Sequence, residues 1–192
     1  QEDVLRVNEK LMTELFTRCS GMKTQDMPFP RFSYREAMNL FGSDKPDLRN
    51  SLRISDVSEV FGQSQFRVFQ EAIAKGGSVR AIAVPVEAIP SRKYFDDTVE
   101  FFSKLDREEP ALGLAYLSFD GDLCKGSIAK FVSPEETAKL RAALNLPKPA
   151  VVFLAAGPSG RILPALGKLR TKVGAELTKL ENNSNGIVVE GG

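Results

Sequence analysis

Apolar residues recur in helical steps through the first twenty residues of the chain. Val4, Leu11 and Leu15 follow this spacing, and most positions between them are polar or charged. The pattern predicts an amphipathic helix over residues 3–19, ending near Gly21. Cys19 falls on the apolar face of this helix, so we expect a buried thiol there.

A second, shorter helix is predicted to begin after Ser33. Pro28 and Pro30 favour an extended backbone before it. Ser33 and Glu36 have the spacing of a capping box, in which the two residues satisfy free amides at a helix start. Gly42 stands where a residue in the left-handed conformation would end this helix.

From residue 52 onward, runs with strand character alternate with runs of helical spacing. Four strands are predicted, over residues 52–57, 79–85, 112–119 and 151–156. Four helices are predicted, over residues 66–75, after Ser91, from Ser133 to Leu144, and after the turn at 157–160, where Pro164 would remove one backbone hydrogen bond. This order favours an α+β fold, a two-layer sheet with helices packed mainly on one face.

The ends of the chain do not share this pattern. Residues 1–51 look like a piece of another unit, so we expect a domain over residues 52–181 and an exit loop over residues 182–192. The chain opens Gln1-Glu2-Asp3 without an initiator methionine, and we therefore expect a fragment or a processed product.

Composition excludes several classes of function. The 192 residues contain no histidine, which removes the usual general base and the commonest metal ligand. Cys19 and Cys124 fit no metal or redox spacing, so a self-contained hydrolase or zinc enzyme is not expected. The net charge of +1 creates no global field that would attract nucleic acid, although a local basic patch stays open. No apolar run approaches the roughly 20 residues needed to span a bilayer.

The segment Ser43-Asp44-Lys45-Pro46-Asp47-Leu48-Arg49 carries the densest candidate chemistry. Ser, Asp and Pro are enough to build a turn, and a turn needs no further charges such as those of Lys45, Asp47 and Arg49. Asp beside Lys or Arg can orient a carboxylate, an amine or a phosphate. Two interpretations remain open: a charged connector that pairs with itself or a neighbouring unit, and the edge of a ligand site.

Basic residues suggest a second function. The last predicted helix carries positive charge along its length at Arg161, Lys168, Arg170 and Lys172, and another helix begins with Arg92 and Lys93. Such side chains can contact an RNA backbone, but they are also typical of a solvated helix face. We retain Arg92, Lys93, Lys168 and Arg170 as candidate RNA contacts.

Two further patterns have a plainer interpretation. The 156–161 run follows a buried strand and opens a helix, where free amides could bind phosphate. It matches no phosphate-binding motif, so a strand-to-helix turn is favoured. The carboxylates at 106–109 and at Asp120 and Asp122 have no partner base or metal pattern, which favours solvated loops and predicts no metal site.

The sequence also resembles a known family. The run from Pro28 to Arg49 matches the segment P-F-P-x-x-x-Y-x-E-A-x-x-x-x-G-S-D-K-P-D-L-R of bacterial-type aspartyl-tRNA synthetases. Residues 79–85, 113–116, 127–131 and 166–170 resemble, in order, segments of the GAD insertion domain of those enzymes. The likeness covers nearly the whole chain, and its G-S-D-K-P-D-L-R run is the most specific part.

This resemblance implies a class II synthetase, an aspartate–tRNA ligase that uses ATP and Mg²⁺ to activate aspartate and transfers it to tRNA(Asp). It implies a GAD/DCoH-like insertion domain preceded by a helical part of the catalytic domain, in a homodimeric parent that is cytoplasmic or organellar. It further implies that Ser43, Asp44 and Lys45 lie near the aminoacyl-adenylate site or support it.

The resemblance has a limit. The sequence contains neither the motif-two and motif-three arginines, nor the paired histidines, nor the anticodon-binding barrel of that family. The implied role is therefore an accessory module that holds no cofactor and is inactive alone. The alternative is a non-catalytic GAD-type module that serves as a structural, protein-binding or RNA-binding surface.

Overall fold

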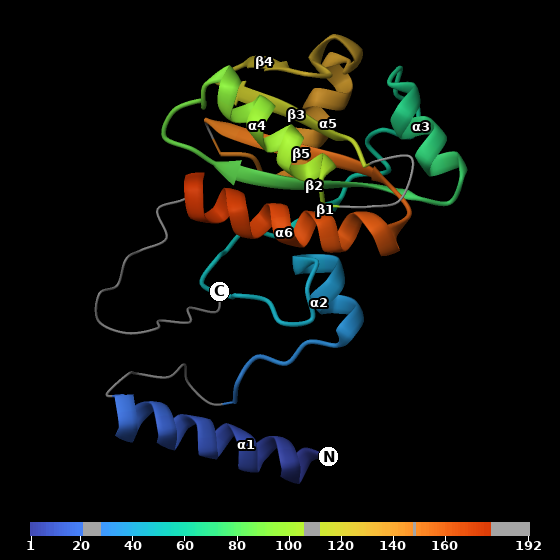
Figure 1. Cartoon of the computed structure of the whole chain (residues 1–192). Helices are drawn as coiled ribbons and strands as arrows, with labels where there is room; N and C mark the ends of the chain where they lie inside the picture. Colours follow the sequence, from blue (N-terminus) through green and yellow to red (C-terminus); the bar gives the residue numbers. More distant parts are fainter. Residues whose placement is uncertain (21–27, 106–111, 148, 178–192) are drawn as a thin grey trace.

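The computed structural model describes residues 1–20, 28–105, 112–147 and 149–177 (Figure 1). The N-terminal part holds α1 (Glu2–Leu15), a π-helical turn at Phe16–Ser20, and α2 (Tyr34–Phe41). Both helices were predicted, and so was the capping box: the Glu36 amide donates to Ser33 Oγ at 3.2 Å, and the Ser33 amide donates to Glu36 Oε2 at 2.8 Å.

The rest of the chain is built around one antiparallel sheet. Its strands are β1 (Ile54–Asp56), β2 (Ser78–Pro85), β3 (Leu114–Asp120), β4 (Leu123–Gly126) and β5 (Ala150–Gly157). They lie in the order β1-β2-β5-β3-β4, so the last strand in the sequence is the middle one in space. β2 and β5 pair over their full length, from Ser78 opposite Gly157 to Pro85 opposite Ala150. Four of the strands were predicted, and β4 was not.

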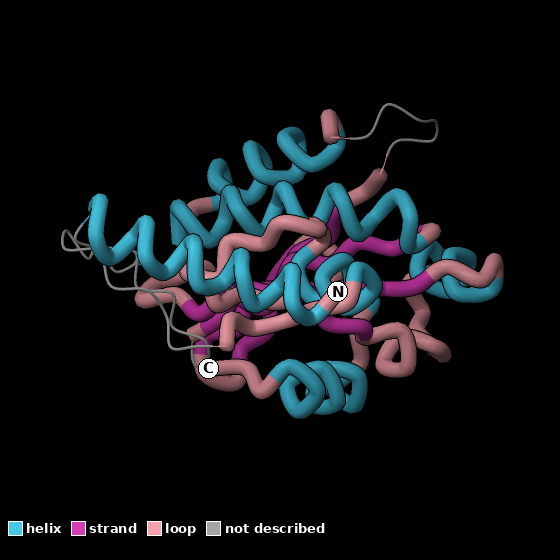
Figure 2. The backbone as a smooth tube through the Cα atoms, turned by 90° about the horizontal axis from the view of Figure 1, so that it is seen from below, coloured by secondary structure: helices cyan, strands magenta, loops and turns pink. Residues whose placement is uncertain are grey.

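Helices cover the sheet on both sides (Figure 2). They are α3 (Arg67–Ala74), α4 (Arg92–Ser103), a 3-10 turn at Ala129–Phe131, α5 (Pro134–Leu144) and α6 (Ser159–Leu177). The α6 helix continues through Pro164. The α+β class is confirmed. The two longest helices of this part, α4 and α6, share one face, but α3 and α5 also cover the other, so the arrangement has three layers rather than two.

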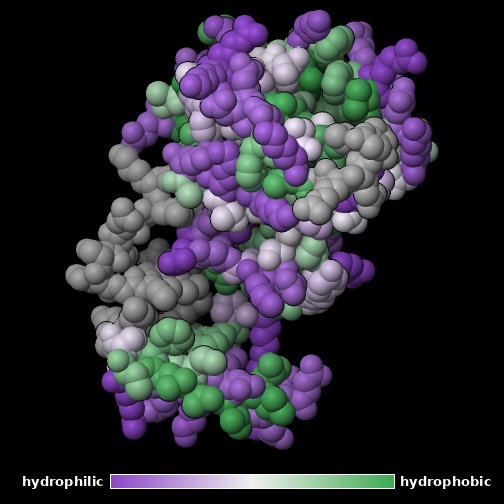
Figure 3. All heavy atoms as spheres, in the orientation of Figure 1, coloured by the Kyte–Doolittle hydropathy of each residue, from purple (hydrophilic) through white to green (hydrophobic). Residues whose placement is uncertain are grey.

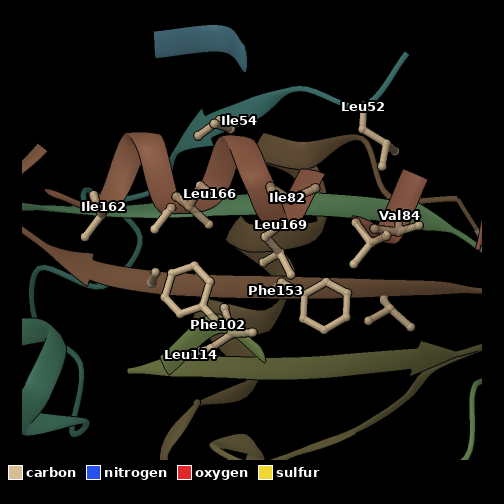
Figure 4. Packing of buried hydrophobic residues seen from close by; sticks show 14 of the residues in the cluster. Leu52, Ile54, Ile82, Val84, Phe102, Leu114, Phe153, Ile162, Leu166 and Leu169 are labelled. Atoms are coloured by element: carbon tan, nitrogen blue, oxygen red, sulfur yellow. The ribbon is translucent and has the colours of Figure 1, made fainter. Parts of the chain in front are cut away.

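The core follows the alternation of the strands. On the face of α4 and α6, Phe153 and Ile82 pack with Phe102, Leu166 and other apolar side chains (Figure 4). The neighbouring positions on the same strands point to the opposite face, where they pack with residues of α3 and α5. Because both faces are buried, β5 reads as an almost continuous apolar run, which is why its position was clear in the sequence.

The α1 helix differs from the other α-helices described, since none of its residues is buried. All of its large apolar side chains except the half-buried Leu5 are exposed, and Figure 3 shows apolar residues gathered at the bottom of the molecule. The exposed side chains are those of Val4, Val7, Leu11, Met12 and Leu15, with Phe16 beyond the helix end. The prediction of a buried Cys19 is wrong, because its thiol is exposed too. The amphipathic pattern was interpreted correctly as a helix, but the described residues include nothing that covers its apolar face.

Among the described residues, no helix is both long and apolar enough to cross a membrane. Within the same residues, no group of three or more Asp, Glu or Cys side chains could hold a metal ion.

Candidate functional site

The end of α2 lies directly against the middle of α6. Gly42 follows α2 in the left-handed conformation, with φ of 66°, and its amide donates to the Met38 carbonyl at 2.9 Å. A Cβ atom built on Gly42 would lie only 2.6 Å from the Gly167 amide nitrogen. Gly167 is crowded in the same way, since its Cβ would lie 2.7 Å from the Gly42 carbonyl carbon. The two backbones therefore touch, and this contact fixes the place where the charged segment begins.

The connector, residues 43–52, runs from this contact to the start of β1. Near the end of the connector, the side chain of Asn50 is buried and forms hydrogen bonds both within the connector and with α6. Its Nδ2 donates to the Arg170 carbonyl at 3.0 Å, and its Oδ1 accepts from the Leu52 amide at 3.0 Å. Gly174, one turn further along α6, leaves room for this amide, because a Cβ there would lie 2.8 Å from Asn50 Cγ.

Arg170 projects from α6 into the curve of the connector and is only 2% exposed. Its Nε donates to the Leu52 carbonyl at 2.6 Å, and its Nη2 donates to the carbonyls of Asp47, at 2.9 Å, and of Asn50. The guanidinium also lies over the Phe41 ring, with Cζ 5.0 Å from the ring centroid. Burial lowers the pKa of Arg170, but an arginine remains charged at neutral pH.

These contacts correct the interpretation of Arg170 as a candidate RNA contact on a solvated helix face. The periodicity of α6 already placed Arg170 next to the apolar Leu169. The charge of arginine suggested an exposed position, but a guanidinium can be buried when carbonyl oxygens accept its hydrogen bonds.

The charges of the 43–49 segment divide into two groups. Asp47 and Arg49 pair with each other, Arg49 Nη2 lying 2.7 Å from Asp47 Oδ2, and the Arg49 amide donates to Asp47 Oδ1 at 3.0 Å. The hydrogen bond from the Arg49 side chain is the main cause that lowers the pKa of Asp47. This half of the segment is the self-paired connector that the first interpretation expected.

The other half remains available to a ligand. Ser43 Oγ accepts from the Lys45 amide at 3.1 Å and shapes the turn. The side chains of Asp44 and Lys45 are exposed, and neither has a polar partner among the residues that the structure describes. The fold therefore presents one carboxylate and one ammonium, two and three residues beyond the point at Gly42 where the backbone is fixed.

The candidate RNA contacts other than Arg170 lie at the surface. Arg92 and Lys93 are exposed at the start of α4, and Arg92 lies 3.9 Å from Asp96. Lys168 is exposed on α6 and, like Lys93, has no polar partner within the described part of the chain. The Tyr94 hydroxyl donates to Glu176 at 2.9 Å, which places the start of α4 beside the last turns of α6, about 12 Å along that helix from Lys168.

Lys172, in contrast, is engaged within the fold. It forms an ion pair with Glu176 and lies over the rings of Tyr94 and Phe101, at 5.9 and 5.4 Å. The phenol of Tyr94 has a raised pKa, first because it is buried and then because it bonds to Glu176. This cluster joins α4 to α6.

The remaining candidates are structural where they are described. At the turn before α6, the amides of Arg161 and Ile162 donate to the Pro158 carbonyl, at 2.9 and 3.1 Å, as in an ordinary helix start. The turn at 120–122 joins β3 to β4, and its Gly121 carbonyl accepts from Arg141 Nη2 at 2.7 Å. The carboxylates at 106–109 lie outside the described residues.

Sequence reasoning missed the residues that fix the connector. The sequence did not indicate the buried contact of Asn50 with α6, because an asparagine after a charged run usually suggests an exposed turn. The glycines were better signals: Gly167 and Gly174 stand seven residues apart in a helical run, and a glycine kept inside a helix often marks the close approach of another backbone or side chain.

Comparisons with known proteins agree with the resemblance described above. The chain is 40% identical over 184 residues to the aspartate–tRNA(Asp/Asn) ligase of Rickettsia canadensis, which covers 95% of this chain and 30% of that protein. The corresponding ligases of Ehrlichia chaffeensis and Wolbachia pipientis are 40% and 41% identical, over 96% and 95% of this chain. The chain thus spans less than a third of the length of these relatives.

The family assignment rests on a match within the sheet-containing part. A family model described as the GAD domain matches residues 69–166, which run from α3 to the middle of α6 and make up just over half of the sequence. The expected likeness to the aspartyl-tRNA synthetases and their inserted domain is therefore confirmed, and the chain belongs to the GAD domain family.

Proposed function

We propose that this chain is a segment of an aspartate–tRNA ligase, and that it presents Ser43, Asp44 and Lys45 to the aminoacyl-adenylate site of the parent enzyme. The proposal is carried by one observation. The fold fixes the backbone on both sides of a turn whose Asp44 and Lys45 side chains stay exposed, in a chain that matches such ligases over 95% of its length.

The chemistry of the two side chains fits that role. An ammonium can bind a carboxylate or a phosphate, and a carboxylate can bind an amine; aspartate and its adenylate offer all three groups. The parent would use ATP and Mg²⁺, and the ligands for both would come from the remainder of the enzyme. The apolar face of α1 would pack against that remainder. The parent would be a homodimer that charges tRNA(Asp), in the cytoplasm or in an organelle.

Aspartate-dependent exchange of pyrophosphate into ATP by the full-length parent tests this role. Lys45→Ala should lower the activation rate by about a hundredfold if Lys45 binds charge that develops in the reaction. Lys75→Ala, which changes an exposed lysine at the end of α3, should leave the rate unchanged and serves as the matched control. If Lys45→Ala activates aspartate and charges tRNA at unchanged rates, the proposal is refuted.

A second candidate function is RNA binding by the GAD part itself. The ammonium groups of Lys93 and Lys168 favour it, because they are exposed and have no polar partner among the residues that the structure describes. Titration of this chain with tRNA at low and moderate salt is the test, because contacts to phosphates weaken as salt rises. Salt-sensitive binding that is reduced in Lys93→Gln and Lys168→Gln would support it, and an absence of binding at low salt would leave a structural role.

A further inference from the structure

Both ends of the segment that carries Asp44 and Lys45 are fixed by the same turn of α6. The upstream end is fixed at Gly42, whose backbone touches Gly167. The downstream end is fixed where Arg170 binds the carbonyls of Asp47, Asn50 and Leu52. Gly167 and Arg170 are three residues apart, so one turn of a helix determines where the whole segment stands.

The chemistry of these contacts shows what Arg170 contributes. All three acceptors are backbone carbonyls, so the guanidinium specifies the path of the connector and not the identity of its side chains. A guanidinium can reach several acceptors at once because its donors form a rigid planar fork. A lysine at this place would carry the charge but could not reproduce the fork.

We propose that Arg170 is a positioning residue for the reaction of the parent ligase. From α6, its guanidinium sets the backbone of the connector and thereby the place of Lys45 at the active site. Arg170 itself does not touch the substrate. The inference rests on the proposed function of the connector, and it adds that α6 controls this part of the site.

The test compares Arg170→Met, Arg170→Lys and Lys45→Ala in the full-length parent. Arg141→Met is the matched control, because Arg141 also donates to a backbone carbonyl and lies over an aromatic ring, but at the β3–β4 turn. Hydrogen–deuterium exchange over residues 43–52 reports the order of the connector. Pyrophosphate exchange reports kcat and KM for aspartate, and circular dichroism confirms that each variant is folded.

Arg170→Met and Arg170→Lys should both speed exchange over the connector, and both should lower kcat for activation by about ten- to a hundredfold, as expected when a reacting group is displaced by about 1 Å. Arg141→Met should do neither. Combined with Lys45→Ala, Arg170→Met should add less than about twofold, because both changes act through the same side chain.

The outcomes separate the two proposals. Unchanged exchange in Arg170→Met would overturn the positioning role. So would a loss of kcat that is equally large with and without Lys45, because the effect would then be a general one. If Lys45→Ala leaves kcat unchanged while Arg170→Met lowers it, the function proposed for Lys45 is refuted. The proposal that Arg170 acts by placing Lys45 is then refuted as well.

Discussion

Replacement of Gly167 by alanine sets two physical effects against each other in the middle of α6. Alanine has the higher helix propensity, by about 1 kcal/mol in a helix interior. The added Cβ, however, would lie 2.7 Å from the Gly42 carbonyl carbon, and it would meet backbone atoms rather than a side chain that could move. The contact can be relieved only if α2 and α6 separate.

The steric effect should outweigh the propensity. Overpacking by a single methyl group costs about 1–3 kcal/mol in cores whose side chains can still adjust, and two backbones in contact adjust less. We therefore expect Gly167→Ala to lower the free energy of unfolding by about 2 kcal/mol after the gain in propensity. In a chain of this size, that change lowers the Tm by about 4–8 °C.

A matched control lies in the same helix. A Cβ on Gly160 would meet nothing within 4 Å, so Gly160→Ala should be neutral or should stabilise the chain by up to about 1 kcal/mol. Urea denaturation of the three proteins, followed by circular dichroism, measures both changes. If Gly167→Ala is as stable as Gly160→Ala, the close approach of α2 and α6 is not a feature of the folded molecule.

Three further predictions concern the neighbouring contacts. Asn50→Ala should lower the free energy of unfolding by about 2 kcal/mol because it leaves buried backbone groups unpaired. Gly174→Ala should be less destabilising in the Asn50→Ala background, where the new Cβ has room. Additive effects of the two changes in urea denaturation would contradict the contact between Asn50 and Gly174. Because the pKa of Asp47 is lowered in the folded state, its ion pair stabilises the fold above pH 3.8, and this stability is lost as the pH falls through the lowered pKa. Arg49→Gln should therefore flatten the acid side of the curve of unfolding free energy against pH. An unchanged slope would refute the stabilising role of this ion pair. Because the pKa of Tyr94 is raised in the folded state, its contribution to stability is fully present below pH 10.0 and declines as the pH rises above that value. The free energy of unfolding of Tyr94→Phe should therefore fall less between pH 9 and 11 than that of the unchanged chain. An equal fall in both proteins would exclude the phenol as its source.

Local signals gave most of the fold. The capping box at Ser33 formed as predicted, because a helix start is determined by residues three apart, and the helix predicted from Ser133 also begins with a capping box. β1 and β2 were found from their alternation, and β3 and β5 from their almost continuous apolar runs, because both patterns can be recognised without any knowledge of the partner strands. β4 was missed because an exposed edge strand of four residues, with only Leu123 and Cys124 apolar, has too short a pattern to stand out.

The candidate site was only half predictable. Its charged segment was visible as a run, but which of its charges pair could not be read from spacing: Asp47 pairs with Arg49, whereas Lys45, equally close to Asp47, does not. The role of Arg170 could not be found either, because its acceptors are backbone carbonyls about 120 residues away and such atoms leave no mark in a sequence.

The position of β5 in the middle of the sheet has a consequence during synthesis of the chain. β2 and β3 both pair with a strand that is made after them, and the connector binds a guanidinium that is made about 120 residues later. At ribosomal rates of roughly 5–20 residues per second, the connector therefore waits on the order of 6–24 s for Arg170. Its final shape becomes available only after the ribosome has completed the sheet. A chain whose synthesis stalls before Arg170 would therefore contain a connector that has not yet been ordered.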